Sequence, residues 1–204
     1  FPAIGDSRPL SICLAGNYDQ NVALWKEMMF FSKFTSKKAL RKQAESLYAG
    51  VVERARDEAL YERFRVTDSI DGRFDALVLH IFLVVRALLS EGDRANGLVS
   101  LLLETFVTDM DRSMRELGVG DLSVGKKVKS MMGAYRGRAQ AYDEAFEDAK
   151  AFETVLIRNL YRGEDPGHEI LSRLRHRLEK DAEALCMQAP SVLAGQPLAW
   201  AEAE

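Results

Sequence analysis

The stretch from Ala76 to Leu89 reads ALVLHIFLVVRALL and is apolar on nearly every side of a helix. Such a segment either crosses a membrane or lies in the middle of a protein core. Its 14 residues would span about 21 Å as a helix, against about 30 Å for the hydrocarbon layer of a bilayer. It also carries His80 and Arg86. We therefore expect a central buried helix near residues 72–91 and no transmembrane span.

The remainder of the chain also has the pattern of helices. Apolar residues recur three or four positions apart, and the alternation typical of strands is absent. Further helices are predicted near residues 36–64, 96–117, 123–144, 146–161 and 165–187. Asp71 stands where an N-cap of the apolar helix is expected. The 204-residue chain is therefore predicted to be all-α, with a single domain of about six or seven helices.

The two ends of the chain are set apart from this helical domain, which we place at residues 28–187. Residues 1–27 precede Met28, the first methionine, and form an extension that is a tag, a mis-called upstream sequence or an arm. Residues 188–204 contain prolines and a glycine and are expected to form a loose tail, from which Trp200 can dock back.

One segment has a glycine–lysine pattern close to that of a phosphate-binding loop. Gly120, Gly125 and Lys126 have the spacing G-x4-G-K, but Lys127 stands where such a loop needs a hydroxyl side chain. The loop also requires a preceding strand, and the residues before Gly120 have helical periodicity. We therefore expect a tight turn between two helices and no nucleotide site.

The predicted helix after this turn has two different sides. At about 100° per residue, Val128, Met132 and Tyr135 share one side, and the opposite side is positively charged. We call that opposite side, together with the residues at its edges, the basic face. Its residues are Lys126, Lys127, Lys129, Gly133, Arg136, Gly137 and Arg138. Its two glycines have the spacing that lets another backbone approach closely. The face is predicted to bind a partner; the alternative is a solvated surface whose glycines touch a neighbouring helix of the same domain.

A second candidate surface lies at the start of the helical region, where aromatic residues stand beside lysines. These residues are Phe30, Phe31, Lys33, Phe34, Lys37 and Lys38. Such a segment can lie at an anionic membrane surface, where each basic residue contributes about 1 kcal/mol. The alternative is an ordinary first helix whose phenylalanines join the core, and the sequence does not choose between the two.

No catalytic or metal-binding constellation stands out. His80 lies in the apolar helix and is expected to be a hydrogen-bonded core histidine. His168 and His176 lack the acidic or cysteine cluster that would complete a metal site. Asp109 and Asp111 superficially resemble the acidic motif of prenyl-diphosphate enzymes, but no second cluster exists, so we expect these aspartates to pair with arginines. The sequence predicts no enzyme, no metal and no cofactor.

Three blocks of the sequence resemble one family. They are LYAGVVERAR at residues 47–56, DGRFDALVLH at 71–80 and DMDRSMRELGVGDLSVGK at 109–126. The blocks are similar to those of the ubiquinol–cytochrome c chaperone family, the assembly factors of the respiratory cytochrome bc complex (complex III). The resemblance covers about residues 45–162. One departure is the sequence AYRGR, where an aromatic pair is expected before Gly-Arg, so the surface around Arg136 is expected to differ.

The resemblance implies an all-helical, non-enzymatic chaperone that binds newly made cytochrome b and assists complex III assembly. Such a chaperone is expected to have a hydrophobic groove. Mitochondrial members also bind a small partner protein and sit near the ribosome exit, and these contacts stay open for this chain. An Arg/Ser-rich transit peptide is absent, so we expect a bacterial member, cytoplasmic and peripheral at the inner membrane.

The alternative function is a peripheral membrane- or ribosome-binding adaptor that acts through the basic face without a dedicated client. The net charge of −3 is close to balanced, so any basic surface must be local. Phosphates of an anionic membrane or of ribosomal RNA are candidate ligands of that surface. No DNA partner is expected.

Overall fold

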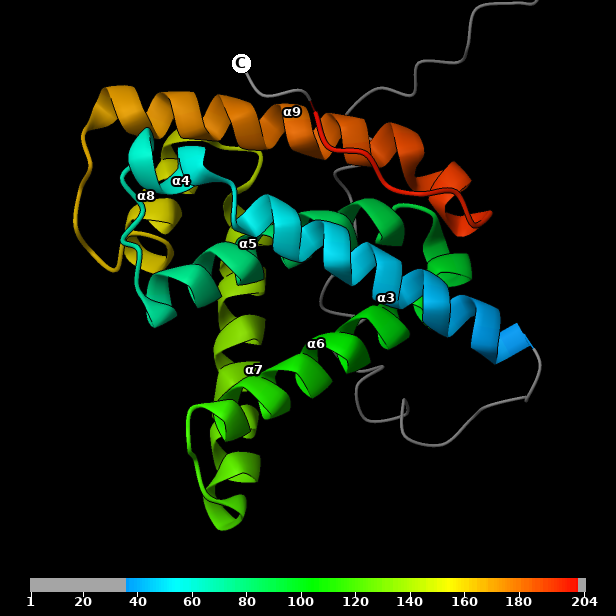
Figure 1. The fold of residues 1–204 in the computed structure, drawn as a ribbon. Helices are drawn as coiled ribbons and strands as arrows, with labels where there is room; N and C mark the ends of the chain where they lie inside the picture. Colours follow the sequence, from blue (N-terminus) through cyan, green and yellow to red (C-terminus); the bar gives the residue numbers. More distant parts are fainter. Residues whose placement is uncertain (1–35, 202–204) are drawn as a thin grey trace, which may run out of the picture.

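The computed structural model describes residues 36–201, in which every regular element is helical (Figure 1). In chain order the elements are α3 (Ser36–Ala55), α4 (Glu58–Glu62), α5 (Ile70–Leu89), the 3-10 helix η1 (Gly92–Ala95), α6 (Asn96–Glu116), α7 (Asp121–Ala145), α8 (Ala149–Asn159) and α9 (His168–Leu193). The prediction of one all-α domain is confirmed.

Helix α5 is the centre of the domain, as its apolar sequence predicts. Every residue from Ala76 to Leu89 is buried, and α3, α7 and α9 pack around the helix (Figure 1). The Nδ1 atom of His80 lies 2.7 Å from the carbonyl oxygen one turn earlier, and Arg86 forms ion pairs with Asp143 and Glu147. In the described part of the chain, no helix is both long and apolar enough to cross a bilayer.

The start of α5 differs from the prediction, because Ser69 and not Asp71 is its N-cap. The Ser69 hydroxyl accepts a hydrogen bond of 3.0 Å from the backbone N–H of Gly72. A Cβ atom on Gly72 would overlap the carbonyl oxygen of Thr67, so only glycine fits this turn. The turn directs Asp75, one turn into the helix, toward the protein interior, where it is fully buried.

The helix predicted over residues 36–64 is two helices. α3 ends at Ala55, and the Asp57 carboxylate accepts a hydrogen bond of 2.9 Å from the backbone N–H of Ala59, which caps α4. Arg177 of α9 forms an ion pair with the same carboxylate. The good helix formers on both sides of Asp57 predict continuation, but an aspartate that binds the backbone locally favours a break.

Helix α9 is longer than predicted. It continues to Leu193, six residues beyond the expected end of the helical domain. Pro190 lies inside it and cannot donate the usual backbone hydrogen bond. Ala189 and Val192 are buried on the inner side of this last segment, and their burial offsets the missing bond. The predicted loose tail therefore begins as the final turns of a helix.

The end of the tail packs back onto the body and is not loose. Residues 198–201 return along α9 and α3 (Figure 1). The Gln188 side chain donates to the carbonyl oxygen of Ala199 and accepts from its N–H, at 2.8 and 2.9 Å. Trp200 Nε1 donates a hydrogen bond of 3.1 Å to the carbonyl oxygen of Gly50 on α3. The tail is thus part of the helical domain.

Candidate functional site

The predicted basic face lies on a part of α7 that projects from the body. Gly118, with φ of +79°, turns the chain between α6 and α7. The turn and the start of α7 project beyond the body (Figure 1), while the inner side of this segment, with Val124, Val128 and Met132, is buried; we call residues 117–133 the arm. Gly125 and Lys126 lie inside α7 and follow a helix and a turn, so the glycine–lysine pattern is not a phosphate-binding loop.

Most of the basic face is exposed to solvent. Its exposed members are Lys126, Lys127, Lys129, Gly133, Arg136 and Gly137. The three lysines have no ion-pair partner within residues 36–201. The opposite side of α7, which includes Val128, Met132 and Tyr135, is buried as predicted. The structure therefore presents the lysines in a form that a partner can reach.

Arg138 lies apart from this exposed surface and holds the body together. Its guanidinium is 2.9 Å from the carboxylate of Asp75 and lies over the ring of Phe74. Arg162 approaches the same carboxylate at 3.0 Å. Burial raises the pKa of Asp75 above its ordinary value, and the two arginines oppose this rise. Arg138 thus fixes α7 to the start of α5.

The two glycines of the basic face do not touch a neighbouring helix. A Cβ atom on Gly133 or on Gly137 would meet no atom within 4 Å. The alternative prediction, in which they pack inside the domain, is therefore wrong. Glycine costs a helix about 1 kcal/mol relative to alanine, and no contact in the described structure offsets that cost. The gaps remain open for a partner.

A second candidate surface, which the sequence did not indicate, is a groove of about 950 Å³ between α3, α6 and the tail. We call it the α3–α6 groove. Its charged lining residues are Glu45, Glu53, Arg54, Arg56, Asp57, Glu58, Asp109 and Arg112, and the others are Tyr48, Ala49, Val52 and Trp200. This groove is therefore not the hydrophobic groove that was expected. Charges of both signs dominate it.

Two of the resembling sequence blocks meet at one wall of this groove. The Tyr48 hydroxyl donates a hydrogen bond of 2.7 Å to Asp109, whose carboxylate also pairs with Arg112. Burial raises the pKa of Tyr48 well above its ordinary value, and the Asp109 carboxylate adds to the rise, so the hydroxyl stays a donor. Asp111 pairs with Arg115 at 2.7 Å. The prediction that both aspartates pair with arginines is confirmed.

The floor of the groove is a buried ion pair covered by the tail. Arg54 donates to both carboxylate oxygens of Asp181, at 2.6 and 3.2 Å. The Trp200 ring lies 5.6 Å from the Arg54 guanidinium and meets the His80 ring edge-on at 5.7 Å. His80 is fully buried, and burial lowers its pKa to about 4, so it is neutral at pH 7. It is the core histidine that the sequence predicted.

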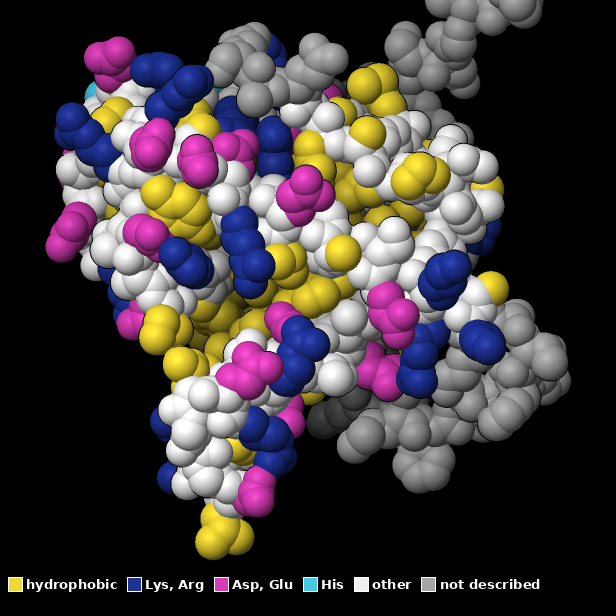
Figure 2. All heavy atoms as spheres, in the orientation of Figure 1, with side chains coloured by type: hydrophobic (Ala, Val, Ile, Leu, Met, Phe, Trp, Pro, Cys, Tyr) yellow, Lys and Arg dark blue, Asp and Glu magenta, His cyan; other side chains and the backbone are white. Residues whose placement is uncertain are grey.

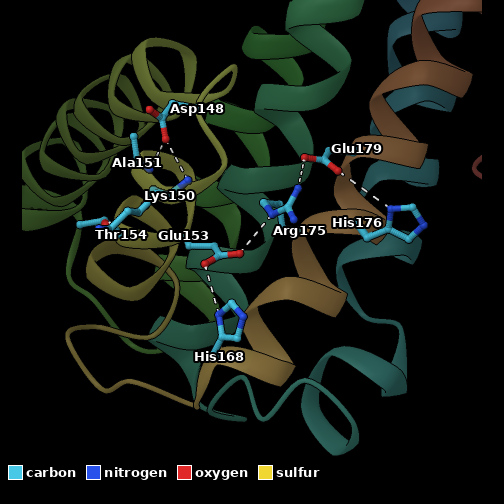
Figure 3. A network of polar contacts seen from close by, with 9 residues as sticks. All are labelled: Asp148, Lys150, Ala151, Glu153, Thr154, His168, Arg175, His176 and Glu179. Atoms are coloured by element: carbon cyan, nitrogen blue, oxygen red, sulfur yellow. Dashed lines mark hydrogen bonds and ion pairs between the residues drawn. The ribbon is translucent and has the colours of Figure 1, made fainter.

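His168 and His176 belong to a network of ion pairs that joins α8 to α9 (Figure 3). Arg175 lies between Glu153 of α8, at 3.1 Å, and Glu179, at 2.6 Å. The histidine Nδ1 atoms lie near separate carboxylates, His168 at 3.9 Å from Glu153 and His176 at 4.0 Å from Glu179. Among the described residues, no group of His, Cys, Asp and Glu side chains gathers to hold a metal ion.

The predicted membrane-surface residues fall mostly outside the described part of the chain. Phe30, Phe31, Lys33 and Phe34 precede it, and the side chain of Lys37 is not described either. Lys38 is exposed in the first turn of α3. This candidate surface stays a prediction, as does the origin of residues 1–27.

The chain is similar to known proteins in two comparisons. The model of a family described as ubiquinol-cytochrome C chaperone matches residues 62–200, which include the whole basic face and Trp200. The crystal structure of the Cbp3 homolog from Brucella abortus is similar with a TM-score of 0.72 and 27% sequence identity. That similarity covers 89% of this chain and 96% of the other. No curated protein matches the chain.

Proposed function

Because the chain belongs to the ubiquinol–cytochrome c chaperone family, we propose that it binds newly made cytochrome b and assists the assembly of complex III. Membership confirms the resemblance inferred from the three sequence blocks. It supports a chaperone role in complex III assembly, and cytochrome b as the client is the finer part of the proposal. The proposed action is binding without turnover of a substrate.

The observation that carries the proposed binding role is the α3–α6 groove. Within residues 36–201, Glu45, Glu53, Arg56 and Glu58 line it without an ion-pair partner. Unpaired charges of both signs are poor neighbours for a bare membrane helix, because burying a charge against apolar side chains is unfavourable. They suit a polar segment that carries its own charges. We therefore propose that the groove receives an extramembrane segment of the client.

An affinity pull-down tests the client. The tagged full chain is used to capture proteins from mildly solubilised membranes of the source cell at low and at high salt, and mass spectrometry identifies them. Recovery of cytochrome b that survives high salt is the expected result. A capture that never contains cytochrome b contradicts the client proposal.

A matched pair of charge reversals tests the groove. Arg56→Glu changes the sign of an unpaired charge in the groove and is expected to reduce recovery of cytochrome b. Arg173→Glu makes the same change on an exposed arginine of α9 outside the groove and is expected to leave recovery unchanged. Equal recovery with both variants would place the client elsewhere on the molecule.

The second candidate function, an adaptor without a dedicated client, is favoured by the exposed lysines of the basic face. Surface lysines attract phosphates, and this attraction is screened by salt. The adaptor therefore predicts that ribosomes or bulk lipid are captured at low salt and lost at high salt. The same pull-down separates the two functions by the identity and salt resistance of what is recovered.

A further inference from the structure

The far end of the arm exposes apolar side chains. Leu122, in the first turn of α7, is fully exposed, and Leu117, just before the turn, is 55% exposed. Figure 2 shows hydrophobic side chains at the extremity of the arm, beyond the charged residues along its length. One exposed leucine is ordinary on a protein surface. Two that flank the same projecting turn form an apolar tip that no described part of the body covers.

The tip is in line with the lysines of the basic face. At about 100° per residue, Leu122, Lys126 and Lys129 fall within about 60° of one another around α7. The buried residues Val124 and Val128 lie on the other side of the helix. A surface that meets the leucine therefore also meets the lysines.

The spacing along the helix axis matches the polar layer of a bilayer. At about 1.5 Å per residue, Lys126 stands about 6 Å and Lys129 about 10 Å behind Leu122. The headgroup layer on each side of a bilayer is about 5–8 Å thick. When Leu122 reaches the edge of the acyl chains, the lysine ammonium groups lie at the depth of the lipid phosphates, helped by their flexible stems.

Arginines partly offset the acidic residues near the tip: Arg112 and Arg115 each pair with two carboxylates, which leaves a charge of about −2 against the three lysines Lys126, Lys127 and Lys129. Asp111 and Asp121 both form ion pairs with Arg115, and Glu116 lies 3.9 Å from Arg112. The arm thus combines an apolar tip with unpaired positive charge, the combination that binds the interface of anionic membranes.

We propose that the arm docks the protein onto an anionic phospholipid bilayer, with Leu122 and Leu117 inserted at the edge of the acyl chains and the lysines on the headgroup phosphates. RNA would also attract the lysines, but it offers no apolar layer for the leucines. The docking adds a membrane attachment to the proposed function and does not depend on which client is bound.

Vesicle flotation with the full chain and no client tests the docking. The vesicles are phosphatidylcholine with and without phosphatidylglycerol, at low and high salt. We expect binding only to vesicles that contain phosphatidylglycerol, and weaker binding at high salt. Leu122→Ser is expected to weaken it about tenfold. Lys126→Gln with Lys129→Gln is expected to weaken it about 25-fold, at about fivefold for each lysine.

Matched controls change the same residue types away from the arm. Met187→Ser removes an exposed apolar side chain of α9, and Lys150→Gln removes an exposed lysine of α8. Both are expected to bind vesicles as the wild type does. Circular dichroism of every variant confirms that the fold is kept. Binding that falls equally in the controls would overturn the assignment to the arm.

Measuring how deeply the tip enters the bilayer distinguishes insertion of the leucines from binding by charge alone. Leu122→Trp places a fluorophore at the tip, and phospholipids brominated on the acyl chains are expected to quench it, above the background of the native tryptophans in the wild type. Absence of quenching, or absence of binding to phosphatidylglycerol vesicles, overturns the proposal. The proposal is also overturned if the protein binds ribosomes but not vesicles, and if that binding requires the lysines but not Leu122. Cytochrome b capture is measured separately, so either proposal can fail alone.

Discussion

Arg54 and Lys126 both carry a positive charge on a long side chain, but their surroundings are opposite. Arg54 is 9% exposed, donates two hydrogen bonds to Asp181 and lies under the ring of Trp200. Lys126 is exposed on the arm and has no ion-pair partner in the described part of the chain. The Arg54–Asp181 pair uses its charge inside the fold, whereas the arm presents the charge of Lys126 to solvent.

The difference follows the chemistry of the two residue types. A planar guanidinium matches a carboxylate with two parallel hydrogen bonds, whereas a compact ammonium group is strongly hydrated. In the described structure the buried basic side chains include Arg54 and Arg86, and every lysine whose side chain is described is exposed or half-buried. The basic side chains buried in the described structure are thus arginines, whereas the lysines stay where solvent or a partner can reach them.

Breaking the buried pair is expected to have the largest effect. Arg54→Met leaves the Asp181 carboxylate buried without a partner and is expected to lower the free energy of unfolding by about 3–5 kcal/mol. Urea denaturation of variant and wild type measures the loss. Arg54→Met with Asp181→Leu removes both charges and is expected to recover most of it. A single variant as stable as the wild type would mean that the pair does not hold this side together.

Acid is expected to destabilise the same side through His80. Burial lowers the pKa of His80 from its ordinary value of 6.5 to about 4, so the unfolded chain binds the proton more readily. Stability from this group is full above pH 6.5 and is lost as the pH falls to about 4. The expected loss is about 3 kcal/mol, measured as urea unfolding free energies across this range.

His80→Asn is the control for this pH dependence, because its amide does not titrate and can donate to the carbonyl one turn earlier. The variant is expected to be less stable at pH 7 but to lose less stability between pH 6.5 and 4 than the wild type. An equal decline in the two proteins would assign the acid sensitivity to other groups.

Two glycines, one in the turn at the start of α5 and one on the arm, are expected to respond to alanine with opposite signs. Gly72→Ala forces a Cβ atom onto the backbone oxygen of Thr67 and is expected to lower the free energy of unfolding by about 1–3 kcal/mol. Gly133→Ala adds a Cβ atom in open space on the arm and is expected to raise it by about 1 kcal/mol. Thermal melts followed by circular dichroism measure both. A destabilised Gly133→Ala would reveal a contact on the arm that the described structure lacks.

Charge reversal on the arm is expected to have the smallest effect on folding. Lys126→Glu with Lys129→Glu changes exposed side chains and is expected to alter the free energy of unfolding by less than about 0.5 kcal/mol. The same double variant is expected to weaken support of complex III assembly in cells, measured as complex III levels. Normal complex III levels would mean that the basic face is only a solvated surface. A large loss of stability would mean that these lysines help to hold the fold together, as Arg54 does.

The features predicted correctly are those that depend on near neighbours along the chain. The run from Ala76 to Leu89 identifies the core helix because apolar residues occur on all its sides. Helical periodicity separates Lys126 and Lys129 from the buried Val128. These assignments need only the geometry of one helix.

Partners that lie far apart in the sequence were not predicted. Arg54 and Asp181 are 127 positions apart, and neither has a local pattern that marks the other. The α3–α6 groove was missed for the same reason, because α3, α6 and the tail meet only in the folded domain. One clue was present: the sequence singled out the blocks that contain Tyr48 and Asp109, and these residues share a hydrogen bond at the groove wall.

The docked tail has a consequence for the order of events during synthesis. α5 leaves the ribosome before α6 to α9, and the residues that carry Trp200 follow all of them. His80 and Arg54 therefore stay uncovered until α9, which carries Asp181, and then the tail have been made. The arm is complete well before the tail emerges. Each newborn molecule thus passes through a period in which all residues of its arm have been made while its α3–α9 side is still open.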